Sequence, residues 1–142
     1  MSNDLNDCAC MNLRKAARLI AQYYDQRLQP SGLRNTQFTL LVTVGHFAPI
    51  SISQLAPHMS TDRTTLTRNV KVLERAGLIG HQAGKDARVR MLILTEEGQQ
   101  AIDDTRPHWE VAQTAFLQKF GKKRWASLKR ELNALLDVID EG

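Results

Sequence analysis

Apolar residues recur at intervals of three and four along most of the chain, which is the spacing of one face of an α-helix. The first such segment runs from 13 to 28, with Asn12 as its expected N-cap and Pro30-Ser31-Gly32 as its stop. A second helix is predicted from Asn35 or Thr36 to Phe47, before the proline at 49. The N-terminal part of the chain is therefore predicted to form two amphipathic helices.

The middle of the chain carries shorter elements. A helix of about two turns is predicted within 51–59, and a further helix is predicted from Asp62 to Ala76, ending at Gly77. Two helices joined by so short a turn are typical of a helix-turn-helix. The pattern then becomes β-rich at 78–82 and 88–94, on either side of a turn-forming stretch, which predicts a β-hairpin.

The C-terminal part returns to helical spacing. Thr95 is the expected N-cap of a long helix that reaches about Phe120, with Pro107 as a kink or irregularity inside it. Gly121 separates this helix from a last one at 122–139. The chain is thus predicted to be mainly α, with one small β-hairpin.

Length and composition exclude several classes of protein. The chain has 142 residues, 42% of them apolar, which suits one globular domain. No apolar run approaches the roughly 20 residues of a membrane span, and the polar, acidic N-terminus is unlike a secretory signal. No phosphate-binding loop or catalytic constellation stands out, and the histidines lack the spacing of metal ligands. We therefore expect a soluble cytoplasmic protein that is not an enzyme and holds no metal or cofactor.

The basic excess of the chain is confined to one segment. The whole chain has a net charge of +4, and residues 61–90 hold seven Lys and Arg against three Asp and Glu, the same excess. The face of the 62–76 helix opposite its apolar stripe carries Thr64, Thr65, Arg68, Lys71 and Arg75. Hydroxyls and long cations on one helix face suit base edges and phosphates in a DNA major groove, although a charge run is also typical of a solvated face. The hairpin adds Lys85, Arg88 and Arg90, which suit the adjacent minor groove or backbone.

Three sets of residues resemble the multiple antibiotic resistance regulator (MarR) family. They are Leu28-x-Pro30-x-Gly32-Leu33 with Gln37-Phe38-x-Leu40-Leu41; Leu55-Ala56, Asp62-Arg63-Thr64-Thr65-Leu66-Thr67-Arg68 and Leu73-Glu74-Arg75-Ala76-Gly77-Leu78-Ile79; and Asp86-x-Arg88 with Leu94-Thr95 and Gly98. The resemblance implies a single domain over 1–142. In it, a winged helix-turn-helix DNA-binding lobe (49–95) is joined to a helical dimerisation lobe built from both chain ends (12–48 and 96–142).

The resemblance also implies roles for individual residues. Residues 62–76 become the recognition helix, and Arg88 becomes a wing-tip arginine that enters the minor groove, held by Asp86. The expected DNA-binding residues are Arg63, Thr64, Thr65, Thr67, Arg68, Lys71, Lys85, Asp86, Arg88 and Arg90. Two alternatives stay open: the Thr67 hydroxyl bonds within its own helix, and Asp86 and Arg88 form an ordinary hairpin ion pair.

The function implied is that of a sequence-specific transcriptional regulator, most simply a repressor. The apolar faces of the terminal helices predict a homodimer, whose two recognition helices would read a pseudo-palindromic double-stranded operator with half-sites roughly 34 Å apart. The alternative is a winged-helix module that docks a protein partner without reading DNA.

Two features are candidates for a signal that releases DNA. Cys8 and Cys10 are candidate redox residues, because two neighbouring thiols can oxidise; the alternative is that they have no role. A small aromatic ligand is the other candidate signal. The side chains expected to line its pocket, or else to belong to the core, are Tyr23, Tyr24, Phe38, His46, Phe47 and Trp109.

Overall fold

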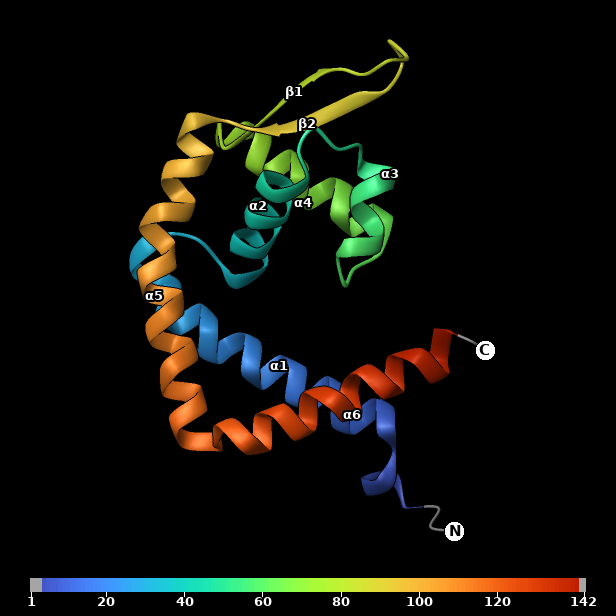
Figure 1. Ribbon diagram of the computed structural model, residues 1–142, viewed down its shortest axis with the longest axis vertical. Coiled ribbons are helices and arrows are strands. Elements are labelled where there is room, and N and C mark those ends of the chain that lie inside the picture. The colour runs from blue at the N-terminus through green and yellow to red at the C-terminus, as the bar shows by residue number, and fades with distance from the viewer. Residues whose placement is uncertain (1–3, 141–142) are drawn as a thin grey trace.

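The computed structural model describes residues 4–140, and it is mostly helical (Figure 1). Its α-helices are α1 (Ala9–Leu28), α2 (Asn35–Phe47), α3 (Ile52–Leu55), α4 (Arg63–Arg75), α5 (Glu96–Phe120) and α6 (Lys122–Asp140). Strands β1 (Ile79–Ala83) and β2 (Arg90–Leu94) form an antiparallel hairpin, and short 3-10 helices lie at Leu5–Asp7, Gln29–Ser31 and Ala56–His58. The prediction of a mainly α fold with one small hairpin is confirmed.

The helices form two groups joined by α5. Figure 1 shows α2, α3, α4 and the hairpin at one end of the molecule and α1 with α6 at the other. The long helix α5 runs along one side and packs on both α1 and α2. No helix among residues 4–140 is long and apolar enough to cross a membrane.

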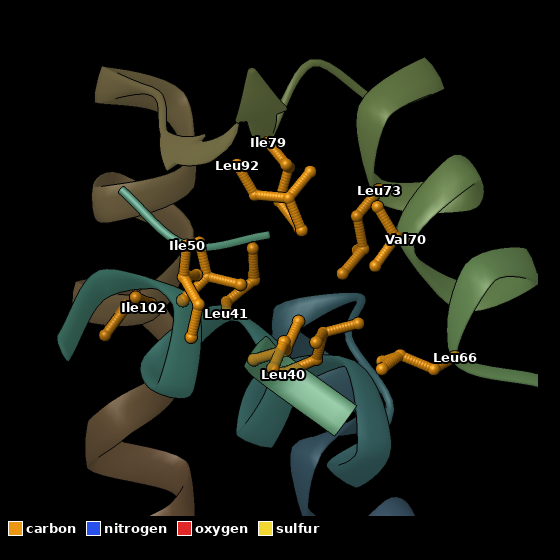
Figure 2. Close-up of a cluster of buried hydrophobic side chains, with 11 residues drawn as sticks. Leu40, Leu41, Ile50, Leu66, Val70, Leu73, Ile79, Leu92 and Ile102 are labelled. Carbon is orange, nitrogen blue, oxygen red and sulfur yellow. The ribbon is translucent and has the colours of Figure 1, made fainter. Parts of the chain in front are cut away.

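One buried cluster holds the hairpin end of the molecule together (Figure 2). Its members are Leu40, Leu41, Val44, Ile50, Leu55, Leu66, Val70, Leu73, Ile79, Leu92 and Ile102. The cluster therefore joins α2 to the helix-turn-helix and the hairpin, and it contains residues on both sides of the boundary expected at 48/49. The assignment of the chain to a DNA-binding lobe and a dimerisation lobe stays a proposal.

Most helix ends lie where the capping residues predict them. The Asp62 carboxylate accepts a hydrogen bond from the Thr65 amide at the start of α4, and the Thr95 hydroxyl accepts one from the Gly98 amide at the start of α5. Gly32 and Gly77 have φ of +80° and +77°, the left-handed conformation that lets the chain leave a helix. Pro107 lies inside α5, which continues past it to Phe120.

The predicted start of the first helix is wrong. α1 begins at Ala9 with Cys8 as the N-cap, one turn earlier than expected. Asn12 lies within the helix, and its side-chain amide donates to the backbone carbonyl oxygens of Asn6 (2.7 Å) and Cys8 (2.8 Å). The 3-10 turn just before Cys8 lets the helix start ahead of its apolar stripe, which the periodicity of apolar residues does not reveal.

The predicted two-turn helix within 51–59 is shorter than expected. Ser51 caps α3, which ends at Leu55, and the chain continues as a 3-10 turn that contains Pro57. Proline has no amide N–H, so an α-helical hydrogen bond from position 57 is not available. The strands are also slightly shifted, to Ile79–Ala83 and Arg90–Leu94.

Candidate nucleic-acid interface

The buried stripe of α4 decides which of its residues face solvent. Leu66, Val70 and Leu73 are each at most 1% exposed, because they pack into the cluster of Figure 2. The opposite side is open and carries a hollow of about 460 Å³ lined by Arg63, Thr64, Thr67, Arg68 and Lys71. Five of the residues expected on the DNA-facing side therefore share one surface.

The cations of this surface have no partner in the part of the chain that the structure describes. Among residues 4–140, no hydrogen bond or ion pair engages the side chain of Arg63, Arg68 or Lys71, and all three residues are exposed. Long cations left unpaired on an open surface are free to contact phosphates or base edges. This is the electrostatic property that a DNA-binding face needs.

Two threonine hydroxyls of α4 are engaged within the helix. The Thr65 hydroxyl donates to an Asp62 carboxylate oxygen at 2.8 Å, and the Thr67 hydroxyl donates to the Arg63 carbonyl at 2.8 Å. The hydrogen bonds from the Thr65 amide and then from the Thr65 hydroxyl hold the pKa of the Asp62 carboxyl below its usual value. Because phosphate oxygens only accept, each threonine would have to release its internal bond to donate to DNA.

The tip of the hairpin presents one arginine to solvent. Asp86 accepts hydrogen bonds from the Arg88 amide (3.0 Å) and from the Arg88 guanidinium at Nε and NH2 (3.3 Å each). The amide, and then the guanidinium, hold the pKa of the Asp86 carboxyl below its usual value. The Arg88 side chain is still 90% exposed, so the pair orients it without removing it from solvent. Lys85 lies at the same tip and is also exposed.

Arg90, unlike the other predicted DNA-binding residues of the hairpin, contacts side chains of other elements. Its guanidinium lies against the His81 ring of β1, 3.1 Å from Nδ1, and 3.9 Å from the Glu74 carboxylate of α4. Neither Glu74 nor His81 was singled out from the sequence, since only the strand register and the approach of α4 bring them to Arg90.

Comparison with known proteins places the chain in a family. The model of the MarR family matches residues 33–89. The crystal structure of the Mycobacterium tuberculosis transcriptional regulator MosR is 33% identical, with 98% of this chain and 100% of that chain covered and a TM-score of 0.85. This chain belongs to the MarR family.

A second structure of MosR and one further relative agree with this assignment. A structure of MosR in complex with DNA is 37% identical to this MarR-family chain, covering 95% of it and 98% of that chain with a TM-score of 0.84. The HTH-type transcriptional regulator YwoH of Bacillus subtilis is 27% identical over 92 residues, which are 65% of this chain and 67% of YwoH. The MarR-family chain is thus a DNA-binding transcriptional regulator, and its relatives are regulators rather than enzymes.

The aromatic residues expected around a ligand do not share one pocket in this MarR-family chain. Phe38 packs on Trp109, with ring centroids 6.4 Å apart, and the ring of Phe47 lies between those of His46 and His58. Tyr23 and Tyr24 instead line an apolar crevice of about 730 Å³ between α1, α5 and α6. They lie apart from the other aromatic residues of the set.

The two tyrosines that line this crevice differ in the bonding of their hydroxyls. Burial, and then the neighbouring Tyr23, raise the pKa of Tyr24, whose hydroxyl is hydrogen-bonded to the side-chain oxygen of Gln113. The Tyr23 hydroxyl is buried and has no hydrogen-bond partner among the described residues.

The two cysteines lie at the start of α1, in the helix group opposite the hairpin (Figure 1). Cys8 is half-buried, Cys10 is exposed, and both are free thiols. Within residues 4–140, no three or more His, Cys, Asp or Glu side chains gather as metal ligands would.

Proposed function

We propose that this regulator is a homodimer that represses transcription by binding a pseudo-palindromic operator. The observation that carries the proposal is the open surface of α4, whose Arg63, Arg68 and Lys71 have no partner among the described residues. In the proposed complex α4 enters the major groove, with Thr64 beside these cations, and the exposed Arg88 enters the minor groove. A regulator that acts on DNA in this way would work in the cytoplasm.

The experiment that tests DNA binding measures operator affinity over a range of salt concentrations. The operator is first selected from genomic fragments bound by the full-length protein. In a plot of log K against log [salt], each phosphate contact contributes about −0.9 to the slope. Lys71→Ala should therefore lower the affinity and make the slope less negative by about 0.9, the contribution of one contact. Arg68→Ala and Arg88→Ala should each lower the affinity by about tenfold.

Lys123→Ala is the matched control, since Lys123 is an exposed lysine on α6. Its affinity and salt slope should equal those of the wild type. Unchanged binding in all three test variants would contradict the proposed surface. Absence of salt-dependent DNA binding would favour a module that docks a protein partner.

The support for a homodimer is the apolar surface that one chain leaves uncovered. No residue of α6 within the described range is buried, and Leu136, Val138 and Ile139 are 56%, 68% and 67% exposed. On α1, Met11 and Leu19 are 51% and 47% exposed. A second copy would cover these apolar faces, which is what a symmetric dimer achieves.

The dimer is tested with charges placed on this apolar face. Because Leu136 and Ile139 are exposed in the single chain, Leu136→Glu/Ile139→Glu should leave the fold intact and block pairing. Sedimentation should then report a monomer, and operator affinity should fall because only one recognition helix binds at a time. Lys123→Glu, which changes a polar position of α6, is the control and should remain dimeric. A dimeric double variant would contradict this interface.

Release from DNA is proposed to follow thiol oxidation or binding of a small aromatic ligand. The support for oxidation is that two free thiols, one of them exposed, lie at the start of α1. One molecule of hydrogen peroxide oxidises two thiols to a disulfide and is reduced to two waters. Peroxide should lower operator affinity of the wild type and not of Cys8→Ser/Cys10→Ser, with the disulfide verified by mass spectrometry.

The support for a ligand is the apolar crevice itself, which Tyr23, Tyr24 and Gln113 line. An aromatic acid or phenol offers both a ring for the apolar side chains and a polar atom for the Gln113 side chain. Benzoate and phenol are suitable probes, and one that binds should raise the melting temperature of the wild type and lower its operator affinity. No effect of peroxide or of either probe on operator affinity would contradict signal-dependent release.

A further inference from the structure

The alternation of side chains along the hairpin places Arg90 on its inner face. Residues that pair directly across an antiparallel ladder share a face, and in this hairpin Ile79 pairs with Leu94 and His81 with Leu92. Leu92 and Ile79 are 2% and 3% exposed, so this face is the one that packs on the cluster of Figure 2. Arg90 stands two residues from Leu92 and therefore continues the same inner face toward the tip.

The guanidinium of Arg90 bridges three elements. From β2 it reaches the diagonal neighbour His81 on β1, 3.1 Å from Nδ1, and the carboxylate of Glu74 near the end of α4, 3.9 Å from Oε2. The same terminal nitrogen makes both contacts. One cation thus connects both strands of the wing, meaning the hairpin 79–94, to the helix that faces DNA.

The charge of Glu74 is unusual at its position. Glu74 is the only acidic residue in α4, Arg63–Arg75, where a carboxylate would repel the phosphates that the other charged residues attract. Its side chain is only 21% exposed, whereas that of Arg90 is 62% exposed. The carboxylate is therefore turned toward the wing, where Arg90 offsets its charge.

We propose that Glu74, His81 and Arg90 form a brace that holds the wing against the C-terminal end of α4. In this brace Arg90 is a positioning residue and not a DNA contact. The inference rests on the proposed function, because the brace acts by placing the wing-tip Arg88 where it meets DNA. The side chain of Arg88 is itself 90% exposed, and among residues 4–140 it forms hydrogen bonds and an ion pair only with Asp86, so its position depends on that of the wing.

Whether Glu74→Gln raises or lowers operator affinity distinguishes this positioning role from direct DNA contact by Arg90. If Arg90 bound a phosphate, Glu74→Gln would free Arg90 and remove a negative charge from α4, and operator affinity would rise. If Arg90 belongs to the brace, Glu74→Gln lowers operator affinity by about two- to fivefold, the range expected from a partly exposed ion pair. Arg90→Ala should cause a loss of similar size.

The brace also predicts how the variants combine. Glu74→Gln/Arg90→Ala should bind no more weakly than the weaker single variant, because both changes break one contact. In an Arg88→Ala background, either change should have little further effect, because the brace acts through Arg88. Amide exchange at Gly84, whose N–H donates to the Val89 carbonyl across the wing (3.1 Å), should be faster in both single variants without DNA. Glu110→Gln, at an exposed glutamate of α5, should change neither affinity nor exchange.

The outcomes also distinguish failure of the brace from failure of the proposed function. Affinity that rises or stays unchanged in Glu74→Gln, while Arg68→Ala and Arg88→Ala weaken binding, would overturn the brace alone. Additive losses in Glu74→Gln/Arg90→Ala would overturn it as well. Unchanged binding in Arg68→Ala and Arg88→Ala would remove the proposed DNA interface on which the brace depends.

Discussion

Thr95, which directly follows β2, connects the end of α4 to the start of α5 through one hydroxyl. This hydroxyl donates to the carbonyl of Gly77 at 2.6 Å, just after α4, and accepts from the amide of Gly98 at 2.9 Å, in the first turn of α5. Thr95→Val keeps the shape of the side chain and removes both hydrogen bonds. Loss of the N-cap costs about 1 kcal/mol, and loss of the hydrogen bond to the exposed Gly77 carbonyl costs about 1 kcal/mol more. We expect the free energy of unfolding to fall by about 2 kcal/mol.

Urea unfolding followed by far-UV circular dichroism measures this change, at one fixed protein concentration for all variants. The melting temperature should fall by about 6 °C, since about 3 °C is lost per kcal/mol in a chain of this size. Thr95→Ser is the matched control, because serine supplies the same donor and acceptor and should recover most of the stability. A loss below about 0.5 kcal/mol in Thr95→Val would refute the reasoning, as would an equal loss in the serine variant.

Three further predictions concern the same end of the molecule. Leu66→Ala removes a fully buried side chain and should lower the free energy of unfolding by about 2–5 kcal/mol, measured by urea unfolding. Gly98→Ala would place a Cβ 2.1 Å from the Leu78 carbonyl oxygen, so the backbone must move; a variant as stable as the wild type would contradict this close approach. The hydrogen bonds from Thr65 lower the pKa of Asp62 in the folded protein. Ionised Asp62 therefore stabilises the fold fully above its pKa in the unfolded chain, about 4. This stabilisation is lost as the pH falls through the pKa of Asp62 in the folded protein. The stability difference between wild type and Asp62→Asn should therefore shrink below about pH 4 in urea titrations, and a difference independent of pH would contradict the role of the charge.

Much of the fold follows from short-range patterns. α2 spans Asn35–Phe47 and Thr95 caps α5, both as predicted, and α4, predicted from Asp62 to Ala76, spans Arg63–Arg75 with Asp62 as its N-cap. These boundaries depend on capping side chains and on glycine, whose effects act within one helical turn. The start of α1 was predicted wrongly, because the turn at Leu5–Asp7 has no apolar periodicity to reveal it.

Part of the candidate DNA-binding surface also follows from the sequence. Helical periodicity alone places Arg68 and Lys71 opposite the buried stripe of α4, and the family resemblance adds Arg63; the structure finds all three on one open surface. The sequence also separates the basic segment 61–90 from the neutral remainder. Family membership, which motifs along the chain indicated, is confirmed by the comparisons with known proteins.

The pairing of side chains is decided only in three dimensions. Arg90 belongs to the same basic run as Arg88, yet it is turned inward to His81 and Glu74, while Arg88 stays in solvent. That difference depends on which face of the hairpin meets α4, a result of strand register and core packing between residues distant in sequence. The sequence by itself thus determined the helices, the hairpin and the charge of the segment, because these are local properties. Tertiary structure decided which charges are free and which are paired, because pairing depends on contacts between elements.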